Sequence, residues 1–295
     1  METVTILTPT YNRAHLLPKL YDSLCAQTSK DFCWIVVDDG SIDDTPRLIK
    51  KIAATAPFKV IGISKKNGGK HTAVNLGVKK IETPLTFIVD SDDRLTCEAV
   101  SLICSCHQKY KNNKTISGYC FLKGSAEGSI LDGHFAEKES IGNYIDDRLN
   151  KNMWGDKAEV YYTHILQKFP FPEYQGEKFI SEDIVWIQIA LKYNIVQVDQ
   201  QIYICDYLED GLTQNGRKMK MSSPRGGKAR AELLMAPRCS KRLRLKGALL
   251  YSVYSRILGE PFKMVVKSSP CKVFSALTYP MALYLKNRWE KEVGL

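Results

Sequence analysis

Short runs of apolar, often β-branched residues alternate with segments of helical periodicity along the first half of the chain. The strand-like runs are Val4–Thr8, Cys33–Val37, Val60–Ile63 and Leu85–Val89. The helix-like segments are His15–Ala26, Thr45–Ala54, Lys70–Ile81 and Glu98–Tyr110. Continuous apolar strands separated by helices are typical of a mostly parallel sheet that helices cover on both faces. The sequence therefore predicts an α/β fold.

The pattern is less regular beyond residue 115. Further strands are expected at Ile116–Leu122, Ile195–Val198 and Ile202–Cys205, and further helices at Ser181–Tyr193 and Leu243–Leu258. The segments rich in polar residues and glycine predict a long loop at 124–156 and a mobile loop at 206–230. The predicted helix at Leu243–Leu258 is basic and amphipathic, and it lies in a C-terminal appendage to the sheet.

A polar segment follows each of the first four predicted strands directly. These segments are Pro9-Thr10-Tyr11-Asn12-Arg13, Asp38-Asp39, Asn67-Gly68-Gly69-Lys70 and Asp90-Ser91-Asp92-Asp93. Ligands of parallel α/β sheets bind beyond the carboxyl ends of the strands. We therefore expect the four segments to form one binding site.

The segment Asp90-Ser91-Asp92-Asp93 places three carboxylates within four residues at a strand end. These charges repel one another unless a cation or a donor-rich ligand compensates them. Carboxylate oxygens suit Mg²⁺ or Mn²⁺, which commonly bridge a few carboxylates and the phosphates of a substrate. The alternative is an acidic turn before the helix that begins near Thr96.

The other segments carry weaker signals. One carboxylate of Asp38-Asp39 suits a turn cap, and the other suits a base or a ribose. A glycine-rich turn at 67–70 can bring Lys70 near a phosphate, although the chain lacks a P-loop and a GxGxxG motif. Glu182-Asp183 opens a predicted helix, where it suits either the helix dipole or a general base.

Charge is concentrated at the C-terminal end of the chain. The protein has 295 residues with 42 Lys and Arg against 32 Asp and Glu. Residues 217–295 alone hold 18 Lys and Arg against 4 Asp and Glu. Such a basic segment suits an anionic lipid surface or a nucleic acid, or it is a solvated helical cap.

The nine cysteines and the apolar stretches bear on the compartment. The number of cysteines is odd, no CxxC pair occurs, and most cysteines lie in apolar runs, so we expect free thiols in a reducing cytosol. Met1-Glu2 leads straight into a strand-like run, so we expect no signal peptide. The longest nearly apolar stretch, Val273–Leu285, falls short of the ~20 residues of a spanning helix.

These motifs together resemble the family 2 glycosyltransferases, whose fold is the Rossmann-like GT-A type. The resemblance runs from about Val4 to Asn215 and rests on five motifs in a fixed order. They are Thr8-Pro9-Thr10-Tyr11-Asn12-Arg13, Val37-Asp38-Asp39-Gly40-Ser41, Asn67-Gly68-Gly69 with Asn75, Asp90-Ser91-Asp92-Asp93 and Glu182-Asp183. The stretches at 171–173, 177–179 and 207–213 are similar to a bacterial subgroup that builds surface polysaccharides.

The resemblance implies a role for each motif residue. The residues implied to bind the nucleotide are Pro9, Tyr11, Arg13, Asp39, Lys70, Asp90 and Ser91. Asp92, with Asp93, is implied to hold Mn²⁺ or Mg²⁺ on the diphosphate, and Asp183, next to Glu182, is implied to be the catalytic base. No His follows His164, so Arg217, Lys218 or Lys220 would replace the residue that closes over the diphosphate in other members.

The implied enzyme is an inverting glycosyltransferase that moves a sugar from a nucleotide-diphosphate donor, usually UDP-linked, to a saccharide or lipid-linked acceptor. Its catalytic domain would be residues 1–216, with a nucleotide-binding half (1–115) and an acceptor half (116–216). Residues 217–295 would be a basic helical region. We expect a cytoplasmic protein with no nucleic-acid partner. A further expectation is that it associates peripherally with the inner face of an anionic membrane. The alternatives are a sugar nucleotidyltransferase and a non-catalytic nucleotide-sugar-binding relative.

Overall fold

A computed structural model describes residues 2–131, 133–153, 155–205 and 216–294. The chain forms two compact units. The first unit consists of Met1–Asn143, Trp154–Pro170 and Lys192–Tyr207. The second unit consists of Tyr144–Met153, Phe171–Leu191 and Leu208–Leu295.

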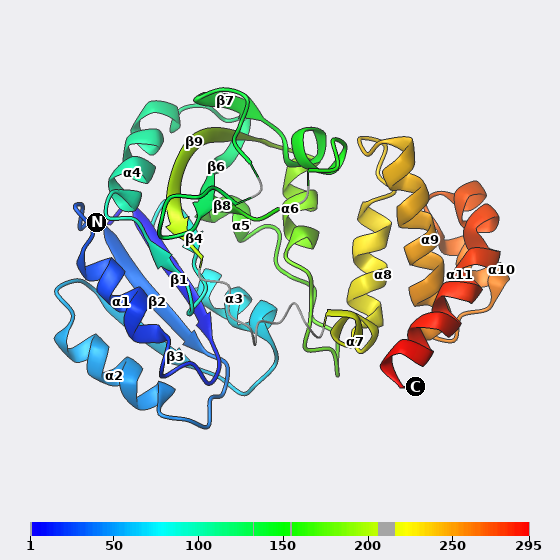
Figure 1. Ribbon diagram of the computed structural model, residues 1–295, viewed down its shortest axis with the longest axis horizontal. Coiled ribbons are helices and arrows are strands. Elements are labelled where there is room, and N and C mark those ends of the chain that lie inside the picture. Colours follow the sequence, from blue (N-terminus) through cyan, green and yellow to red (C-terminus); the bar gives the residue numbers. More distant parts are fainter. Residues whose placement is uncertain (1, 132, 154, 206–215, 295) are drawn as a thin grey trace. The chain divides into compact units, whose positions relative to one another are not determined.

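The first unit is built on one mixed sheet, which holds nine strands among the described residues (Figure 1). The strands are β1 (Val4–Thr10), β2 (Phe32–Asp38), β3 (Val60–Ser64), β4 (Leu85–Ile88), β5 (Arg94–Leu95), β6 (Ile116–Gly124), β7 (Glu139–Gly142), β8 (Lys157–Tyr162) and β9 (Asn194–Ile204). Their order is β3-β2-β1-β4-β8-β6-β9-β5, and β7 pairs with β9.

The first four strands are parallel and adjacent. β1 pairs with β2 and β4, and β2 pairs with β3, all in parallel register. The carboxyl ends of the four strands therefore meet at one edge of the sheet. β8 runs antiparallel to both β4 and β6, while β6 and β9 are parallel. The predicted α/β class is confirmed, and its parallel character is strongest in β1–β4.

Helices cover both faces of the parallel strands. The helices of the first unit are α1 (Leu17–Cys25), α2 (Thr45–Thr55), α3 (Lys70–Val78), α4 (Ala99–Tyr110) and α5 (Thr163–Leu166). Side chains alternate between the faces of a strand, and α1 and α2 contact one face, where Tyr21 stacks on Trp34 and Ile49 lies over Gly62. On the other face α3 packs Gly77 so closely on Leu7 that a Cβ there would lie 2.3 Å from Leu7 Cδ1.

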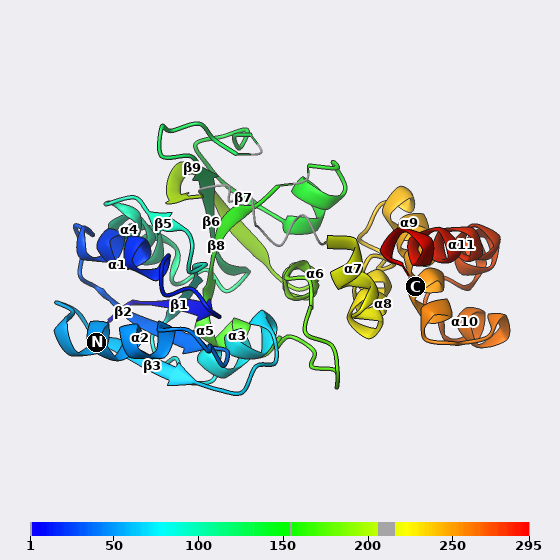
Figure 2. The ribbon, with the colours of Figure 1, turned by 60° about the horizontal axis from the view of Figure 1, so that its bottom comes forward.

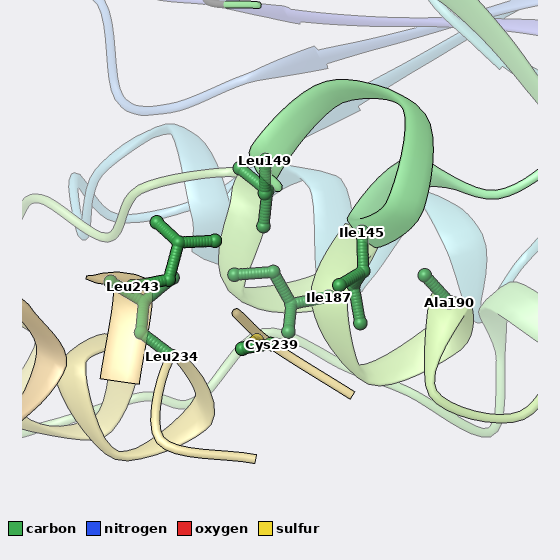
Figure 3. Close-up of a cluster of buried hydrophobic side chains, with 7 residues drawn as sticks. All are labelled: Ile145, Leu149, Ile187, Ala190, Leu234, Cys239 and Leu243. Carbon is green, nitrogen blue, oxygen red and sulfur yellow. The ribbon is translucent and has the colours of Figure 1, made fainter. Parts of the chain in front are cut away.

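The second unit is helical in its described residues (Figure 2). It holds a π-helical turn (Tyr144–Leu149), α6 (Asp183–Ala190), α7 (Gly216–Met221), α8 (Pro224–Leu233), α9 (Lys241–Ile257), α10 (Phe262–Ser268) and α11 (Lys272–Val293). A buried apolar cluster joins the π-helical turn, α6 and the α8–α9 segment (Figure 3). Its members are Ile145, Leu149, Ile187, Ala190, Leu234, Cys239 and Leu243. The cluster explains why segments distant in sequence form one unit.

Two loop predictions were wrong in part. Of the predicted mobile loop at 206–230, residues 206–215 lie outside the described residues, and most of the remainder forms α7 and the first part of α8. Packing overrides the low helix propensity of glycine there. A Cβ at Gly226 would lie 2.3 Å from Ile180, and one at Gly227 would meet the ring of Tyr254. The predicted loop at 124–156 contains β7 and the π-helical turn.

The compact units do not divide at residue 216. Tyr144–Met153 and Phe171–Leu191 belong to the helical unit, although they precede the expected start of the C-terminal region. The assignment of residues 1–216 to a catalytic domain stays a prediction. All nine cysteines are free thiols. Across the part of the chain that the structure describes, no helix combines the length and the apolar character that crossing a membrane requires.

Candidate functional site

Backbone and side-chain bonds join the loops after β1 and β2. Asn12 has a positive φ of 53°, a conformation that asparagine tolerates better than most residues. Its side-chain oxygen accepts the N–H of Ile42 at 2.9 Å, and its own N–H donates to Ser41 Oγ at 2.8 Å. Asp38 Oδ1 accepts both the N–H and the hydroxyl of Ser41. Asp38 is therefore the turn-capping member of its pair.

Asp39 binds the loop that follows β3. Its buried carboxylate accepts Lys65 Nζ at 2.6 Å, Asn67 Nδ2 at 3.1 Å, and the N–H groups of Gly68 and Gly69 at 3.0 and 2.7 Å. Gly69 has a φ of 97°, which favours glycine. These contacts fix the glycine-rich turn just before Lys70, the first residue of α3.

Lys70 and Asp90 form an ion pair at the same sheet edge. Lys70 Nζ lies 2.5 Å from Asp90 Oδ1, and both side chains are about one-third exposed. Burial alone would raise the pKa of Asp90, but the charges of Lys70 and Lys123 outweigh it and hold that pKa below its usual value. The pKa of Lys123 is raised, because the charges of Asp90 and Asp156 outweigh its burial. Asp90 is thus ionised at neutral pH.

The other two carboxylates of the acidic segment have different surroundings. Asp92 is 28% exposed, and its Oδ2 lies 3.8 Å from Arg13 Nη2. Asp93 accepts the hydroxyl of Tyr203 at 2.7 Å, and that same hydroxyl accepts the N–H of Asp90 at 3.0 Å. Burial and the charge of Asp90 raise the pKa of Asp93 to about 7. Negative charge is therefore only partly compensated around Asp92 and Asp93.

The acidic segment fits a cation that a ligand helps to hold. Within the described ranges, no three His, Cys, Asp or Glu side chains are arranged as a complete metal site. Mg²⁺ and Mn²⁺ on a diphosphate typically use one or two carboxylates and complete their shell with phosphate oxygens and water. Asp92 is the carboxylate of the segment that suits this role, since its contact with Arg13 is long, at 3.8 Å, whereas Asp90 and Asp93 are held by Lys70 at 2.5 Å and by Tyr203 at 2.7 Å.

The remaining candidates for nucleotide binding differ in exposure. Tyr11 is 45% exposed directly after β1, so its ring is accessible for stacking. Pro9 is buried within β1 opposite Val37. Ser91 is buried between Asp90 and Asp92.

Glu182 and Asp183 lie in the second unit, at the start of α6. Asp183 accepts the Nε of Arg230 at 2.8 and 2.7 Å, lies 2.5 Å from its Nη2, and accepts the hydroxyl of Ser181 at 2.6 Å. Burial alone would raise the pKa of Asp183, but the charge and hydrogen bonds of Arg230 outweigh it and lower that pKa. Asp183 is therefore an ionised carboxylate held by an arginine of α8.

Four residues that contact the candidate residues at the sheet edge and at the start of α6 were not predicted from the sequence. Lys65 follows β3 and had a weak local signal, since it stands between a strand and the glycine-rich turn. Lys123 and Tyr203 come from β6 and β9, and Arg230 comes from α8. No local motif marks these three residues, because only the tertiary fold brings them to Asp90, Asp93 and Asp183.

The parallel strands with their polar edge loops form an α/β fold of the GT-A type. Residues 5–112 match the family model Glycosyl transferase family 2, and this segment contains β1–β4 and the Asp90–Asp93 segment. This match assigns the segment at residues 5–112, and not the whole chain, to the family 2 glycosyltransferases.

Curated relatives support the same family. An uncharacterised glycosyltransferase of Rickettsia felis is 26% identical over 203 residues, covering 68% of this chain and 32% of that protein. The teichoic acid poly(glycerol phosphate) polymerase of Staphylococcus epidermidis is 28% identical over 195 residues, covering 63% and 26%. The undecaprenyl-phosphate 4-deoxy-4-formamido-L-arabinose transferase of Klebsiella pneumoniae is 28% identical over 174 residues, covering 56% and 50%. The chain spans half or less of the length of these relatives.

Solved structures support the fold. The crystal structure of S. aureus TarS has a TM-score of 0.61 at 19% identity, covering 98% of this chain and 54% of that one. TarS 1-349 in complex with UDP-GlcNAc has a TM-score of 0.61 at 16% identity, covering 99% and 92%. The mannosyltransferase PcManGT from Pyrobaculum calidifontis, in complex with GDP-Man and Mn²⁺, has a TM-score of 0.52 at 16% identity, covering 99% and 83%.

Proposed function

We propose that this protein is an inverting, metal-dependent glycosyltransferase that uses a nucleotide-diphosphate sugar, with UDP as the nucleotide. The observation that carries the proposal is the pairing of Lys70 with Asp90 and of Arg13 with Asp92 at the carboxyl edge of the parallel strands. Both pairs lie within the segment that matches family 2. Their cations suit a diphosphate, and their carboxylates suit a ribose and a divalent cation.

The donor would bind with its base and its phosphates on different loops. Tyr11 would stack on the base, with Pro9 and Arg13 beside it. Asp39 would act on the donor in two ways. It would hold the 65–69 loop in place before Lys70, and it would also accept a hydrogen bond from the base. Asp90 and Ser91 would face the ribose. Support for a UDP-sugar comes from the likeness to TarS, whose structure in complex with UDP-GlcNAc has this fold.

Asp92, with Asp93, would hold Mn²⁺ or Mg²⁺, and PcManGT in complex with GDP-Man and Mn²⁺ supports this part of the proposal. A bound divalent cation offsets the negative charge that grows on the departing diphosphate. Lys70 and Arg13 would add fixed positive charge next to that group. Arg217, Lys218 and Lys220 of α7 are further candidates, and Arg217 is ion-paired with Glu292 at 3.0 Å.

Asp183 would take the proton from the acceptor hydroxyl as that oxygen attacks the sugar, with Glu182 next to it. A general base must be deprotonated at the working pH, and Arg230 keeps Asp183 ionised. The acceptor would be a saccharide or a lipid-linked sugar of a surface polysaccharide. The names of the Staphylococcus epidermidis polymerase and the Klebsiella pneumoniae transferase support this class of acceptor. With a lipid-linked acceptor, the protein would work on the cytoplasmic face of the membrane.

The base assignment predicts the behaviour of Asp183→Asn. The proposed base acts on the acceptor hydroxyl, and slow hydrolysis of a UDP-sugar takes place without an acceptor. The reaction to measure is therefore sugar transfer to an acceptor. We expect transfer to fall about 10²–10⁴-fold, while donor affinity stays within about twofold. Because the neutral amide would leave Arg230 without its charge partner, circular dichroism should confirm folding. The Asp183→Asn/Arg230→Gln variant serves as the second measurement. Near-normal transfer by either folded variant would remove Asp183 from the catalytic role.

A further inference from the structure

α11 presents large apolar side chains to solvent along one side. Val273, Leu277, Met281 and Tyr284 are 69%, 71%, 53% and 61% exposed. Their spacing of four, four and three residues places them on one stripe of a helix. The opposite side of the helix buries small residues, including Ser275 and Ala282. Phe274 and Tyr279 also pack toward the other helices, so the outward stripe is a second apolar side of α11.

α10 enlarges this surface. It packs beside α11 (Figures 1 and 2). The ring centroids of Phe262 and Tyr279 lie 4.7 Å apart. Phe262 and Met264 are themselves 45% and 53% exposed. We call the set Phe262, Met264, Val273, Leu277, Met281 and Tyr284 the α10–α11 surface. Contiguous exposed apolar side chains on a folded protein mark an interaction site.

Basic side chains accompany the α10–α11 surface. Lys263 and Lys267 are exposed on α10, and Lys272 is exposed at the start of α11. Arg288 and Lys291 are exposed on the stripe side of α11, one to two turns beyond Tyr284. Residues 262–293 hold six Lys and Arg against two Glu. The charge next to the apolar stripe is therefore positive.

We propose that the α10–α11 surface docks the protein on an anionic lipid bilayer. Helices that lie in a bilayer interface combine an apolar stripe with lysine and arginine beside it, since the stripe enters the acyl boundary and the cations meet lipid phosphates. The cores of protein–protein interfaces are instead depleted of lysine. A second copy of this chain would bring like charges together. Charge complementarity thus selects anionic lipid as the occupant.

The docking inference rests on the proposed function in one respect: docking would serve to bring the enzyme to a lipid-linked acceptor. Vesicle binding is measured without donor or acceptor, so the two proposals can fail separately. If the protein does not bind vesicles but still transfers sugar to a soluble acceptor, the docking proposal alone is overturned. Vesicle binding without any transfer would overturn the glycosyltransferase alone.

The test is co-sedimentation of the full chain with phosphatidylcholine vesicles, with and without phosphatidylglycerol. We expect binding to the anionic vesicles that weakens with added salt. Leu277→Ser/Met281→Ser should weaken it at least tenfold, without a change of charge. Lys263→Gln/Lys267→Gln should remove much of the preference for anionic lipid. Ile42→Ser is the matched control, because Ile42 is 89% exposed in the first unit, and it should bind as the wild type does.

Three results would overturn the docking. One is equal binding to neutral and anionic vesicles, and another is unchanged binding of Leu277→Ser/Met281→Ser. The third is a dimer in light scattering that the same double variant dissociates, because the surface would then hold a second copy.

Discussion

The motif and the contacts of Asp39 indicate two different roles, one in binding a ligand and one in holding a loop of the protein. The motif places it after a strand, where a carboxylate can bond a base. The structure gives its carboxylate four donors from the 65–69 loop, including Lys65 at 2.6 Å. Because these donors position the turn before Lys70, Asp39 would affect donor binding even without touching the donor.

We expect Asp39→Asn to destabilise the protein by about 2–3 kcal/mol, since hydrogen bonds to a charged group contribute roughly that much and the amide turns one acceptor into a donor. Urea unfolding measures the difference. Asp44→Asn is the control, because Asp44 is exposed and makes no side-chain cap. If both variants unfold at the same urea concentration, Asp39 does not stabilise the loop.

The ion pair of Asp183 with Arg230 predicts a pH dependence of stability. The folded-state pKa of Asp183 lies below its ordinary value of about 3.9. The stabilisation is therefore complete above the ordinary value and is lost as the pH falls toward the folded-state value. The quantity to measure is the free energy of unfolding of the wild type minus that of Asp183→Asn/Arg230→Gln. We expect this difference to be the same at pH 7 and pH 5 and to be smaller at pH 3. A difference that is the same at all three values would contradict the ion pair.

At the scale of elements, the repeated β1–α1–β2–α2–β3–α3–β4 pattern could be read from the sequence. Its strands are continuous apolar runs, and α1 and α2 between them each have a clear apolar face. β5 and β7 could not be predicted, because Arg94–Leu95 and Glu139–Gly142 are too short and polar to differ from loops. β8 was missed, although its Val160-Tyr161-Tyr162 run consists of residues that favour strands. α7 and α8 were missed because lysine, arginine and glycine dominate them, and their stability comes from packing on other helices.

The packing of α3 on the sheet predicts the effect of enlarging Gly77. A Cβ there would lie 2.3 Å from the fully buried Leu7, so Gly77→Val should overpack the interface and destabilise the protein by about 1–3 kcal/mol. Thermal or urea unfolding measures this. Gly216→Ala is the control, since a Cβ at that helix start meets no atom within 4 Å. Equal stability of Gly77→Val and the wild type would show that α3 can move away from β1.

At the scale of the whole molecule, the sequence predicted which motifs follow the parallel strands, but it did not predict how the candidate residues divide between the two units. Arg13, Lys70 and Asp90–Asp93 lie in the first unit with the sheet, whereas Glu182 and Asp183 belong to the helical unit. This division could not be read from the sequence, because the second unit is assembled from three separate segments by the cluster around Ile187 and Leu234. The basic surplus in the C-terminal quarter was visible in the sequence. Its association with an exposed apolar stripe required the structure.

The central claim is that a nucleotide-diphosphate sugar binds at Asp92 through a divalent cation. The most direct test is calorimetric titration of UDP-sugars into the wild type and Asp92→Asn, each with and without Mn²⁺, with Asp44→Asn as the control. We predict that Mn²⁺ strengthens donor binding at least tenfold in the wild type and in Asp44→Asn, and that Asp92→Asn loses this gain while remaining folded. A donor affinity that is the same with and without Mn²⁺ in the wild type, or an undiminished gain in Asp92→Asn, would contradict the claim.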